Sequence, residues 1–348
     1  MSRIAVLTSG GDSPGMNSAV TSIARTAAYY GLSLIGIKRG YNGLLGLKDG
    51  AEDDIFEMNL DTVLDLADLP GTYLRTARCQ QFHDPKVREE AAHNLKKLDV
   101  IGLVVIGGDG SFRGAQHLCK LGIPCIGIPG TIDNDLPYTE MTLGYDTAVN
   151  CDVEAVRAIR ATSRSHDRPA VVEVMGRNCG DIALSTAEAT GSEIVLVPEM
   201  PWSVEEVAER LTKLVAAGNT RATIVVAEGA YASMKPFDVY GFLSPYGKEV
   251  FEGQHMNAAL LASTLKRMTN TEVRATVIGY TQRGCQPTAR DCTFAFEAGN
   301  MAVVLLKSGI GNQVIGTRNN RTFHTSIDTA LCETRNFKES LYNLINSL

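Results

Sequence analysis

The chain has 348 residues, of which 44% are hydrophobic, and a formal net charge of −6. Its length predicts more than one domain, and its charge excludes a general attraction to nucleic acid or to an anionic membrane surface. No apolar run approaches a membrane span, and the first 15 residues do not resemble a signal peptide. Eight cysteines without a C-x-x-C pair favour reduced thiols. We therefore expect a cytoplasmic protein.

Short apolar runs rich in β-branched residues alternate with helical patterns along the chain. This alternation predicts an α/β fold of two doubly wound domains with mostly parallel sheets that are covered on both faces. The expected strands are Ile4–Leu7, Leu32–Ile37, Val100–Ile106, Cys125–Ile128, Ala170–Val174, Ile194–Val197, Thr223–Ala227 and Val273–Ile278.

The expected helices lie between these strands. The helix Ser203–Ala217 begins with a capping box formed by Ser203 and Glu206. Residues Ala230–Gly253, rich in Pro, Gly and aromatic residues, form a less regular segment that we interpret as an insertion before a helix near Asn257–Met268. The other expected helices are Asn17–Tyr30, Lys86–Leu98, Phe112–Leu121, Thr147–Ala161 and Ser203–Ala217.

Three of the expected strands lead into a turn that holds glycine and a carboxylate. AVLTSGGD ends at Asp12, VVIGGDGS carries Asp109, and IGIPGTIDND carries Asp133 and Asp135. Parallel strands bind ligands beyond their carboxyl ends, and glycines there let backbone N–H groups approach a phosphate. The segment after Asp12 lacks the Lys-Ser/Thr of a Walker A loop. The pattern predicts a phosphate site of another kind at one edge of one sheet.

The carboxylate of Asp109 would repel a phosphate unless a cation lies between them. Magnesium resolves the conflict, because proteins hold it with one or two carboxylates together with substrate phosphates. The alternative is that Asp109 caps the helix that begins near Ser111.

The segment GTIDND adds two further acids. Phosphoryl transfer needs positioning, charge neutralisation and a carboxylate that takes the hydroxyl proton. One acid can serve the metal and the other the proton. The alternative is an Asx-rich turn without chemistry.

Without a P-loop lysine, arginines must neutralise the phosphates. Arg78, Arg177 and Arg283 lie in turns or at strand ends, whereas Arg168 and Arg274 precede strands and should lie at the opposite end of their sheet. Met175, Gly176 and Glu228 also fall at strand ends, where Glu228 can accept hydrogen bonds from sugar hydroxyls.

The motifs TSGGDSPGMN, VVIGGDGS, PGTIDND, VVEVMGR and RATVIGYTQRG follow one another from residue 5 to about residue 290. In this order they resemble the ATP-dependent 6-phosphofructokinase family. The resemblance implies a nucleotide-binding domain of residues 1–144 plus about 282–332 and a sugar-phosphate-binding domain of residues 145–281 plus about 333–348. The active site would lie in the cleft between them.

The resemblance also implies roles for single residues. Asp133 resembles the general base, assisted by Thr131 and Asp135; Asp109 resembles the magnesium ligand, and Arg177 would bridge both substrates. Arg168 and Arg274 match arginines that reach the sugar phosphate from a neighbouring subunit, which implies a homo-oligomer, a dimer or a tetramer, with shared sites. The nucleotide-side positions are Gly11, Tyr41, Arg78, Cys79, Arg88, Gly108, Asp109, Gly110, Ser111 and Gly114. The sugar-side positions are Thr131, Asp133, Asp135, Arg168, Met175, Gly176, Arg177, Glu228, Arg274, Tyr280 and Arg283.

Some positions bear on the substrates. Gly110 and Gly130 stand where pyrophosphate-dependent members carry Asp and Lys, which implies ATP as donor. Tyr280 replaces the family's usual His, and Cys79, His83 and Cys285 are further departures. The segment 230–253 with the preceding AEGA is more similar to a branch that mixes ATP and pyrophosphate users.

The family's allosteric site is matched only in part. Arg25, Arg160 and Glu193 match it, but Thr21, Ala217 and Asn219 occupy positions that are basic in the short bacterial enzymes. This implies weak or absent control by ADP or phosphoenolpyruvate.

The expected activity is magnesium-dependent transfer of the ATP γ-phosphoryl group to the 1-hydroxyl of fructose 6-phosphate, in glycolysis. The alternatives are a pyrophosphate-dependent enzyme, a kinase of another sugar phosphate such as sedoheptulose 7-phosphate or tagatose 6-phosphate, and a non-catalytic paralogue that senses sugar phosphate or nucleotide.

Overall fold

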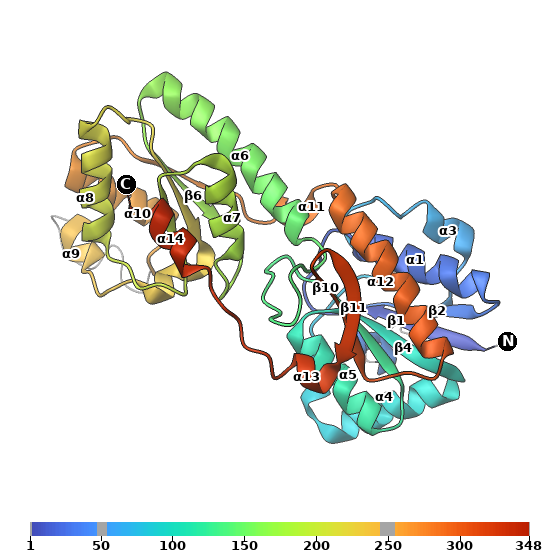
Figure 1. The fold of residues 1–348 in the computed structure, drawn as a ribbon. Helices are drawn as coiled ribbons and strands as arrows, with labels where there is room; N and C mark the ends of the chain where they lie inside the picture. Colours follow the sequence, from blue (N-terminus) through green and yellow to red (C-terminus); the bar gives the residue numbers. More distant parts are fainter. Residues whose placement is uncertain (1, 47–53, 244–254, 348) are drawn as a thin grey trace. The chain divides into compact units, whose positions relative to one another are not determined.

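The computed structural model describes residues 2–46, 54–243 and 255–347. The chain divides into two compact units (Figure 1). Unit 1 contains Met1–Thr147 and Arg283–Arg335, and unit 2 contains Ala148–Gln282 and Asn336–Leu348.

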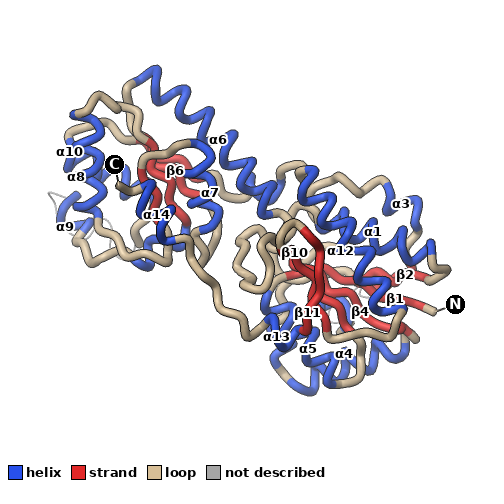
Figure 2. The backbone as a smooth tube through the Cα atoms, viewed as in Figure 1, coloured by secondary structure: helices blue, strands red, loops and turns tan. Residues whose placement is uncertain are grey.

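Unit 1 is built on a seven-stranded sheet in the order β11-β10-β5-β4-β1-β2-β3 (Figure 2). The central strands are parallel, and antiparallel pairing occurs between β2 and β3 and between β10 and β11. This confirms the expected α/β fold with a mostly parallel sheet. The strands are β1 (Arg3–Thr8), β2 (Ser33–Ile37), β3 (Ile55–Glu57), β4 (Val100–Gly107), β5 (Cys125–Pro129), β10 (Gln313–Arg318) and β11 (Arg321–Ser326).

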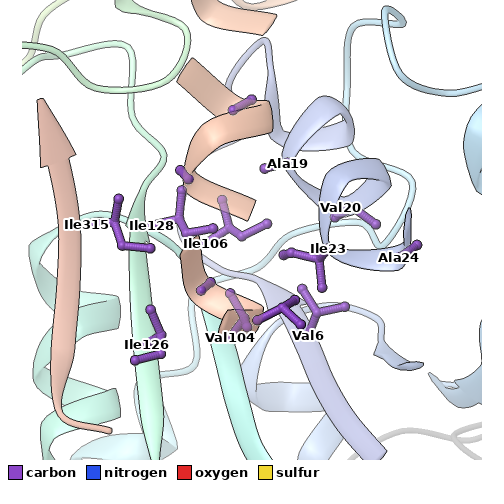
Figure 3. Packing of buried hydrophobic residues seen from close by; sticks show 14 of the residues in the cluster. Val6, Ala19, Val20, Ile23, Ala24, Val104, Ile106, Ile126, Ile128 and Ile315 are labelled. Atoms are coloured by element: carbon purple, nitrogen blue, oxygen red, sulfur yellow. The ribbon is translucent and has the colours of Figure 1, made fainter. Parts of the chain in front are cut away.

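Helices cover both faces of this sheet. Successive strand residues point to opposite sides, so each strand contributes apolar side chains to two clusters. Val6, Val104 and Ile126 pack under α1 (Met16–Tyr29) and α12 (Ala289–Lys307), as Figure 3 shows. Their strand neighbours, such as Leu7, Leu103 and Val105, form a second cluster on the other face. The helices of that second cluster are α2 (Tyr41–Leu44), α4 (Pro85–Lys97), α5 (Asp109–Lys120) and α13 (Ile327–Ala330).

Unit 2 contains a four-stranded parallel sheet in the order β7-β8-β6-β9. β9 lies at the edge, and all four of its residues are exposed. The strands are β6 (Ala170–Val174), β7 (Ile194–Leu196), β8 (Thr223–Ala227) and β9 (Arg274–Val277). The helices are most of α6 (Tyr145–His166), then α7 (Asp181–Thr190), α8 (Val204–Ala216), α9 (Val239–Leu243), α10 (Ala258–Thr269) and α14 (Glu339–Ile345).

All eight strands expected from the sequence are present, and the predicted helices are confirmed with ends shifted by a few residues. The Ser203 hydroxyl caps α8 by accepting a hydrogen bond from the Glu206 N–H at 3.2 Å. The described part of the segment 230–253 contains the end of a 3₁₀ helix (Glu228–Ser233) and α9, and its remaining residues, 244–253, lie outside the described residues. Elements without a specific prediction are β3, β10, β11, α2, α3 (Leu60–Leu64), α7, α11 (Thr281–Gly284), α12, α13, α14 and the 3₁₀ helices Gln80–His83 and Glu228–Ser233.

Over the described ranges, every helix is too short or too polar to serve as a membrane span.

Candidate active site

The three acid-bearing turns lie side by side at the carboxyl ends of neighbouring strands in the sheet of unit 1, as predicted. β5, β4 and β1 are adjacent strands. The Ser9 N–H donates to the Ile106 carbonyl at 2.9 Å, and the Gly130 N–H donates to the Gly107 carbonyl at 3.0 Å. The Ser111 hydroxyl donates to the Ser9 hydroxyl at 2.9 Å. The turns therefore form one continuous surface.

Gly107 allows this close approach. A Cβ atom there would lie 2.5 Å from the Ser9 carbonyl oxygen and 2.6 Å from the Ser111 Oγ. No side chain fits at that distance, so this glycine brings the β4 turn against the β1 turn.

Asp109 is the first residue of α5, and the N-cap is Gly108, which supplies no side-chain cap. The alternative that Asp109 caps this helix is therefore wrong. Its carboxylate instead accepts two hydrogen bonds from Arg113, at 2.9 and 3.3 Å, and about half of each side chain is exposed. Such exposed pairs contribute only about 0.3–0.5 kcal/mol. A metal bound with phosphates can therefore replace Arg113 as the partner of this carboxylate.

Asp133 lies in a loop, Thr131–Thr142, that closes on itself. Gly130 pairs with Leu143 in an isolated bridge, and the Leu143 N–H donates to the Pro129 carbonyl at 2.8 Å. Inside the loop the Thr142 hydroxyl donates to the Thr131 carbonyl at 2.6 Å. Asp133 is buried, with 8% of its surface exposed. The loop thus fixes the place of this acid.

Asn134 supplies the turn chemistry of this loop. Its φ is +52°, and its side-chain oxygen accepts a hydrogen bond from the Thr142 N–H at 3.1 Å. The Thr131 hydroxyl accepts one from the Asp133 N–H at 3.2 Å. Asn134 and Thr131 therefore help to hold the loop in shape, while Asp133 is buried and Asp135 is exposed.

Asp291, which sequence reasoning missed, secures the end of the loop. It is fully buried and accepts hydrogen bonds from the Gly144 N–H at 2.9 Å, the Thr147 N–H at 2.9 Å and the Thr147 hydroxyl at 2.5 Å. Burial raises its pKa to about 6, and the three hydrogen bonds oppose that rise. On the other side, the Ser13 hydroxyl donates to the Leu143 carbonyl.

Arg283 lies at the β1 turn. Its guanidinium donates to the Asp12 carbonyl at 2.6 Å and lies 3.9 Å from the Asp12 carboxylate. A Cβ atom on Gly11 would lie 2.9 Å from it. Arg283 and Gly11 are therefore neighbours in the structure, although the sequence analysis assigned them to different substrates.

Two of the residues predicted to lie on the nucleotide side, Tyr41 and Gly114, are packed against each other. The Tyr41 ring is buried and stacks on Phe82 at 4.1 Å, and its hydroxyl donates to the Ser111 carbonyl at 2.6 Å. A Cβ atom on Gly114 would lie 2.8 Å from that ring. Tyr41 and Gly114 therefore hold the first turn of α5. Of the other nucleotide-side positions, Arg78 is exposed, while Arg88 and Cys79 are half-buried.

Gly110 and Gly130 differ in their surroundings. A Cβ atom on Gly110 would meet no atom within 4 Å. One on Gly130 would lie 2.8 Å from the Met16 methyl group and 3.0 Å from Ile106. The small size of Gly130 is therefore required by packing, whereas only Gly110 faces open space.

The carboxyl ends of β6 and β8 bring together several residues of unit 2 that were predicted to contact the sugar phosphate. The Arg177 N–H donates to the Glu228 carboxylate at 2.9 Å. A Cβ atom on Gly229 would lie 1.8 Å from the Arg177 carbonyl oxygen, so only glycine fits there. Met175 is half-buried and its N–H donates to Gln282 at 3.3 Å, and the side chain of Arg177 is exposed. Gly176 is buried.

Arg168 and Arg274 lie at the opposite end of the same sheet, as predicted. Arg274 is the first residue of β9 and pairs with Ala170, the first residue of β6. Its guanidinium is 3.9 Å from Glu272 and largely exposed. Tyr280, beyond β9, is 83% exposed. Within unit 2, these two arginines are therefore separated from Arg177 by the length of the strands.

Two of the residues that match the family's allosteric site, Arg160 and Glu193, bind each other. Arg160 pairs with Glu193 at 3.1 Å and donates to the carbonyls of Thr190 and Gly191. Asn219 also donates to Glu193, at 2.9 Å. The donors of Arg160 are largely used within unit 2.

Comparison with known proteins identifies the family. A family model described as phosphofructokinase matches residues 3–306. The chain belongs to the phosphofructokinase family. It is similar to ATP-dependent 6-phosphofructokinase 1 of Clostridium perfringens (strain 13 / Type A), 44% identical over 348 residues, which cover 100% of this chain and 99% of the relative. ATP-dependent 6-phosphofructokinase of Clostridium botulinum (strain Hall) is 42% identical over the same coverage.

Solved phosphofructokinase structures have the same fold. The Saccharomyces cerevisiae phosphofructokinase matches with a TM-score of 0.78 and 30% identity, over 95% of this chain and 45% of that one. The chain therefore spans about half the length of that yeast relative. A pyrophosphate-dependent phosphofructokinase from Marinobacter aquaeolei matches with a TM-score of 0.81 and 21% identity, over 98% and 86% of the two chains. That likeness shows the fold alone.

Proposed function

We propose that the chain is an ATP-dependent 6-phosphofructokinase, which transfers the γ-phosphoryl group of ATP to the 1-hydroxyl of fructose 6-phosphate. The main support for this proposal is that three acid-bearing turns lie together at the carboxyl ends of neighbouring strands. Asp133 is held there in a closed loop beside the turn that contains Asp109. The full-length similarity to enzymes of that name supports it.

In this proposal Asp133 takes the proton of the sugar hydroxyl. A general base must lie within hydrogen-bond reach of that proton, and its position is worth about 10²–10⁴-fold in rate. The closed loop supplies the position, since the Thr142 hydroxyl holds Thr131 and Asn134 sets the turn. Thr131 and Asp135 assist on either side.

The β4 turn receives the nucleotide phosphates. The N–H groups at the start of α5 point toward an anion placed there, and a helix N-terminus favours negative charge. Asp109 would hold magnesium, which when bound neutralises phosphate charge. The exposed partner Arg113 leaves that carboxylate accessible. Gly110 supports ATP as donor, because an acid at this open position would meet the phosphates.

Unit 2 receives the sugar phosphate. Arg177 and Glu228 are fixed together at the carboxyl ends of β6 and β8, with Met175 and Gly176 beside them. In this proposal Arg177 contacts both substrates.

The proposed enzyme is a cytoplasmic homo-oligomer, a dimer or a tetramer. Arg168 and Arg274 lie at the wrong end of the sheet to serve the site of their own chain, and both would reach the sugar phosphate of a neighbour. The exposed edge strand β9 supports this, because unpaired strand edges are usually covered. Val277 on this strand is 60% exposed.

The test is a coupled assay of the purified chain with fructose 6-phosphate and either ATP or pyrophosphate. Turnover with ATP that requires magnesium supports the proposal, and turnover with pyrophosphate alone would replace it with the pyrophosphate-dependent alternative. Absence of turnover with both donors would leave the other sugar phosphates and the sensor role. Asp133→Ser should lower kcat by at least about 10²-fold with little change in sugar KM, and an active variant would overturn the role of Asp133.

A further inference from the structure

Glu173 links three elements of unit 2. It is the fourth residue of β6, and one of its carboxylate oxygens accepts hydrogen bonds from the Tyr231 hydroxyl at 2.8 Å and from the Ala258 N–H at 3.2 Å. Tyr231 belongs to the 3₁₀ helix Glu228–Ser233, and Ala258 is the first residue of α10. The carboxylate therefore joins β6 to the 3₁₀ helix and to the start of α10.

The contact with Ala258 holds the Glu173 carboxylate in place. The first N–H groups of a helix have no partner within the helix, and a helix N-terminus favours negative charge. The Asn257 side chain caps α10 by accepting from the Leu260 N–H at 3.0 Å, and the Ala258 N–H donates to Glu173. Glu173 is thus an anchored acceptor for the Tyr231 hydroxyl.

The Tyr231 hydroxyl is the donor in this contact. Its ring lies edge-on to that of Trp202, with 6.4 Å between the ring centres. Burial, together with the neighbouring Glu173 carboxylate, raises the pKa of Tyr231 above its usual value. The hydroxyl therefore keeps its proton throughout the neutral range and donates it to Glu173.

Tyr231 stands one turn after Glu228 in the 3₁₀ helix. Residues three apart in such a helix lie on the same side. Both side chains bond the segment that contains β6: Tyr231 donates to Glu173, and Glu228 accepts from the Arg177 N–H at 2.9 Å. The two hydrogen bonds therefore attach one side of the helix to β6 and to the turn that follows it.

The 3₁₀ helix has further attachments that do not involve Tyr231. The Trp202 indole N–H donates to the Ala230 carbonyl at 2.7 Å, and the Ser233 hydroxyl donates to the Val197 carbonyl at 3.1 Å. Ala230 is fully buried. Loss of the Tyr231 hydroxyl should therefore loosen the side that carries Glu228 while the helix stays attached.

We propose that Glu173 and Tyr231 are positioning residues for the sugar phosphate, because their hydrogen bond fixes Glu228 where it meets the sugar hydroxyls. The inference rests on the proposed function, in which Glu228 and Arg177 contact the sugar phosphate. Both positioning residues act through Glu228. A single hydrogen bond changes an equilibrium constant by about two- to tenfold. The KM for the sugar phosphate should depend on this contact, whereas the KM for ATP should not.

The experiment compares the purified wild type with Tyr231→Phe, which removes the hydroxyl and keeps the ring. The KM for fructose 6-phosphate should rise about three- to tenfold, with kcat and the KM for ATP within about twofold. The matched control is Tyr342→Phe, the same change at a buried tyrosine of α14 in the same unit. It should leave all three constants within about twofold. Glu173→Gln retains an acceptor oxygen and should raise the sugar KM less than Tyr231→Phe does.

Amide hydrogen exchange, followed by NMR, gives a second readout that needs no turnover. The Arg177 N–H should exchange at least about threefold faster in Tyr231→Phe than in the wild type, because its acceptor Glu228 is less firmly held. Exchange in Tyr342→Phe should match the wild type. A wild type that does not phosphorylate fructose 6-phosphate would refute the proposed function, and the exchange measurement would still decide whether Tyr231 positions Glu228.

Several outcomes would overturn the inference. They are a sugar KM within twofold of the wild type in Tyr231→Phe, an equal rise in the KM for ATP, and unchanged exchange at Arg177. Unfolding of Tyr231→Phe in the absence of denaturant would assign the hydrogen bond to stability alone and would also overturn it. A larger rise in sugar KM for Glu173→Gln than for Tyr231→Phe would do the same, since charge rather than the hydrogen bond would then matter.

Discussion

The substitution Asp291→Asn tests whether the hydrogen bonds of Asp291, at the end of the loop that contains Asp133, hold Asp133 in its position. Asp291 accepts hydrogen bonds from Gly144 with one oxygen and from Thr147 with the other. Asparagine keeps the first acceptor and turns an amide NH₂ toward the Thr147 N–H, which then has no acceptor. We expect the end of the loop to shift while the rest of unit 1 stays folded.

The effect on stability can be worked out at pH 8. Burial raises the pKa of Asp291 to about 6, so its ionised form costs the folded state about 3 kcal/mol relative to the unfolded chain. Asparagine removes that cost, but the loss of the acceptor for the Thr147 N–H destabilises the folded state by about 1–3 kcal/mol. The free energy of unfolding should therefore change by less than about 2 kcal/mol.

The pH dependence has a definite sign. Because the folded pKa lies above the unfolded value of 3.8, the contribution of Asp291 to stability is complete below that value and is lost as the pH rises through about 6. The wild type should thus gain stability relative to Asp291→Asn as the pH falls from 7 to 4. Urea unfolding at several pH values measures this.

The kinetic effect should be larger than the effect on stability. A displacement of about 1 Å in a catalytic group costs about 10²-fold, so we expect kcat to fall about 10–100-fold with both KM values within about threefold. The matched control is Asn346→Asp in unit 2, which mismatches one of two buried hydrogen bonds to Val195 at 3.0 and 3.1 Å. It should lose stability and keep kcat. Wild-type kcat in Asp291→Asn would refute the positioning role.

Three further predictions concern other parts of the chain. Asp152 is fully buried, and burial raises its pKa to about 8. The contribution of this side chain to stability is therefore lost as the pH rises from about 4 to 8. At pH 8 the free energy of unfolding of Asp152→Asn should exceed that of the wild type by up to about 5 kcal/mol. Urea unfolding at pH 5 and 8 checks this, and a pH-independent difference would contradict it. In Gly110→Asp the new side chain enters open space, so the melting temperature should stay within about 1 °C, while like-charge repulsion of the phosphates should lower ATP turnover at least about tenfold. Gly130→Ala should lower the free energy of unfolding by about 1–3 kcal/mol because the core is overpacked. Equal stability of the two variants would count against the packing argument. Because Arg160 and Glu193 bind each other, ADP or phosphoenolpyruvate should change the rate by less than about twofold, below typical allosteric coupling, and sigmoidal kinetics relieved by either would disprove it.

The sequence allowed the common edge of the three turns to be predicted because the relevant signals are local. A buried strand, a glycine turn and an acid stand within ten residues of one another in each case. Parallel pairing then brings strand ends together without any knowledge of side-chain contacts. The separation of Arg274 from Arg177 followed from the same rule, since one precedes a strand and the other ends one.

The antiparallel pair β10–β11 had a signal that was not used. Asn319 and Asn320 both have positive φ and form a two-residue turn between paired Arg318 and Arg321. Two asparagines between alternating strands are typical of such hairpins.

Asp291 could not have been found from the sequence in the same way. Its three donors lie 144 and 147 positions away, and nothing near it marks a buried acceptor. Tyr41 likewise reaches Ser111 across 70 positions. Long-range contacts of this kind depend on the assembled core.

Asp109 and Asp133 differ more clearly in their solvent exposure than in their sequence motifs, and this difference bears on the role proposed for each. Asp109 is about half exposed and its partner Arg113 is equally accessible, so a bound cation can exchange with that partner at little cost. Asp133 is 8% exposed inside a loop whose ends are fixed by Leu143 and Asp291. Electrostatic interactions strengthen where water is excluded, and a base must keep its place while the substrate changes. The exposed acid therefore suits the exchangeable metal, and the enclosed acid suits the proton transfer.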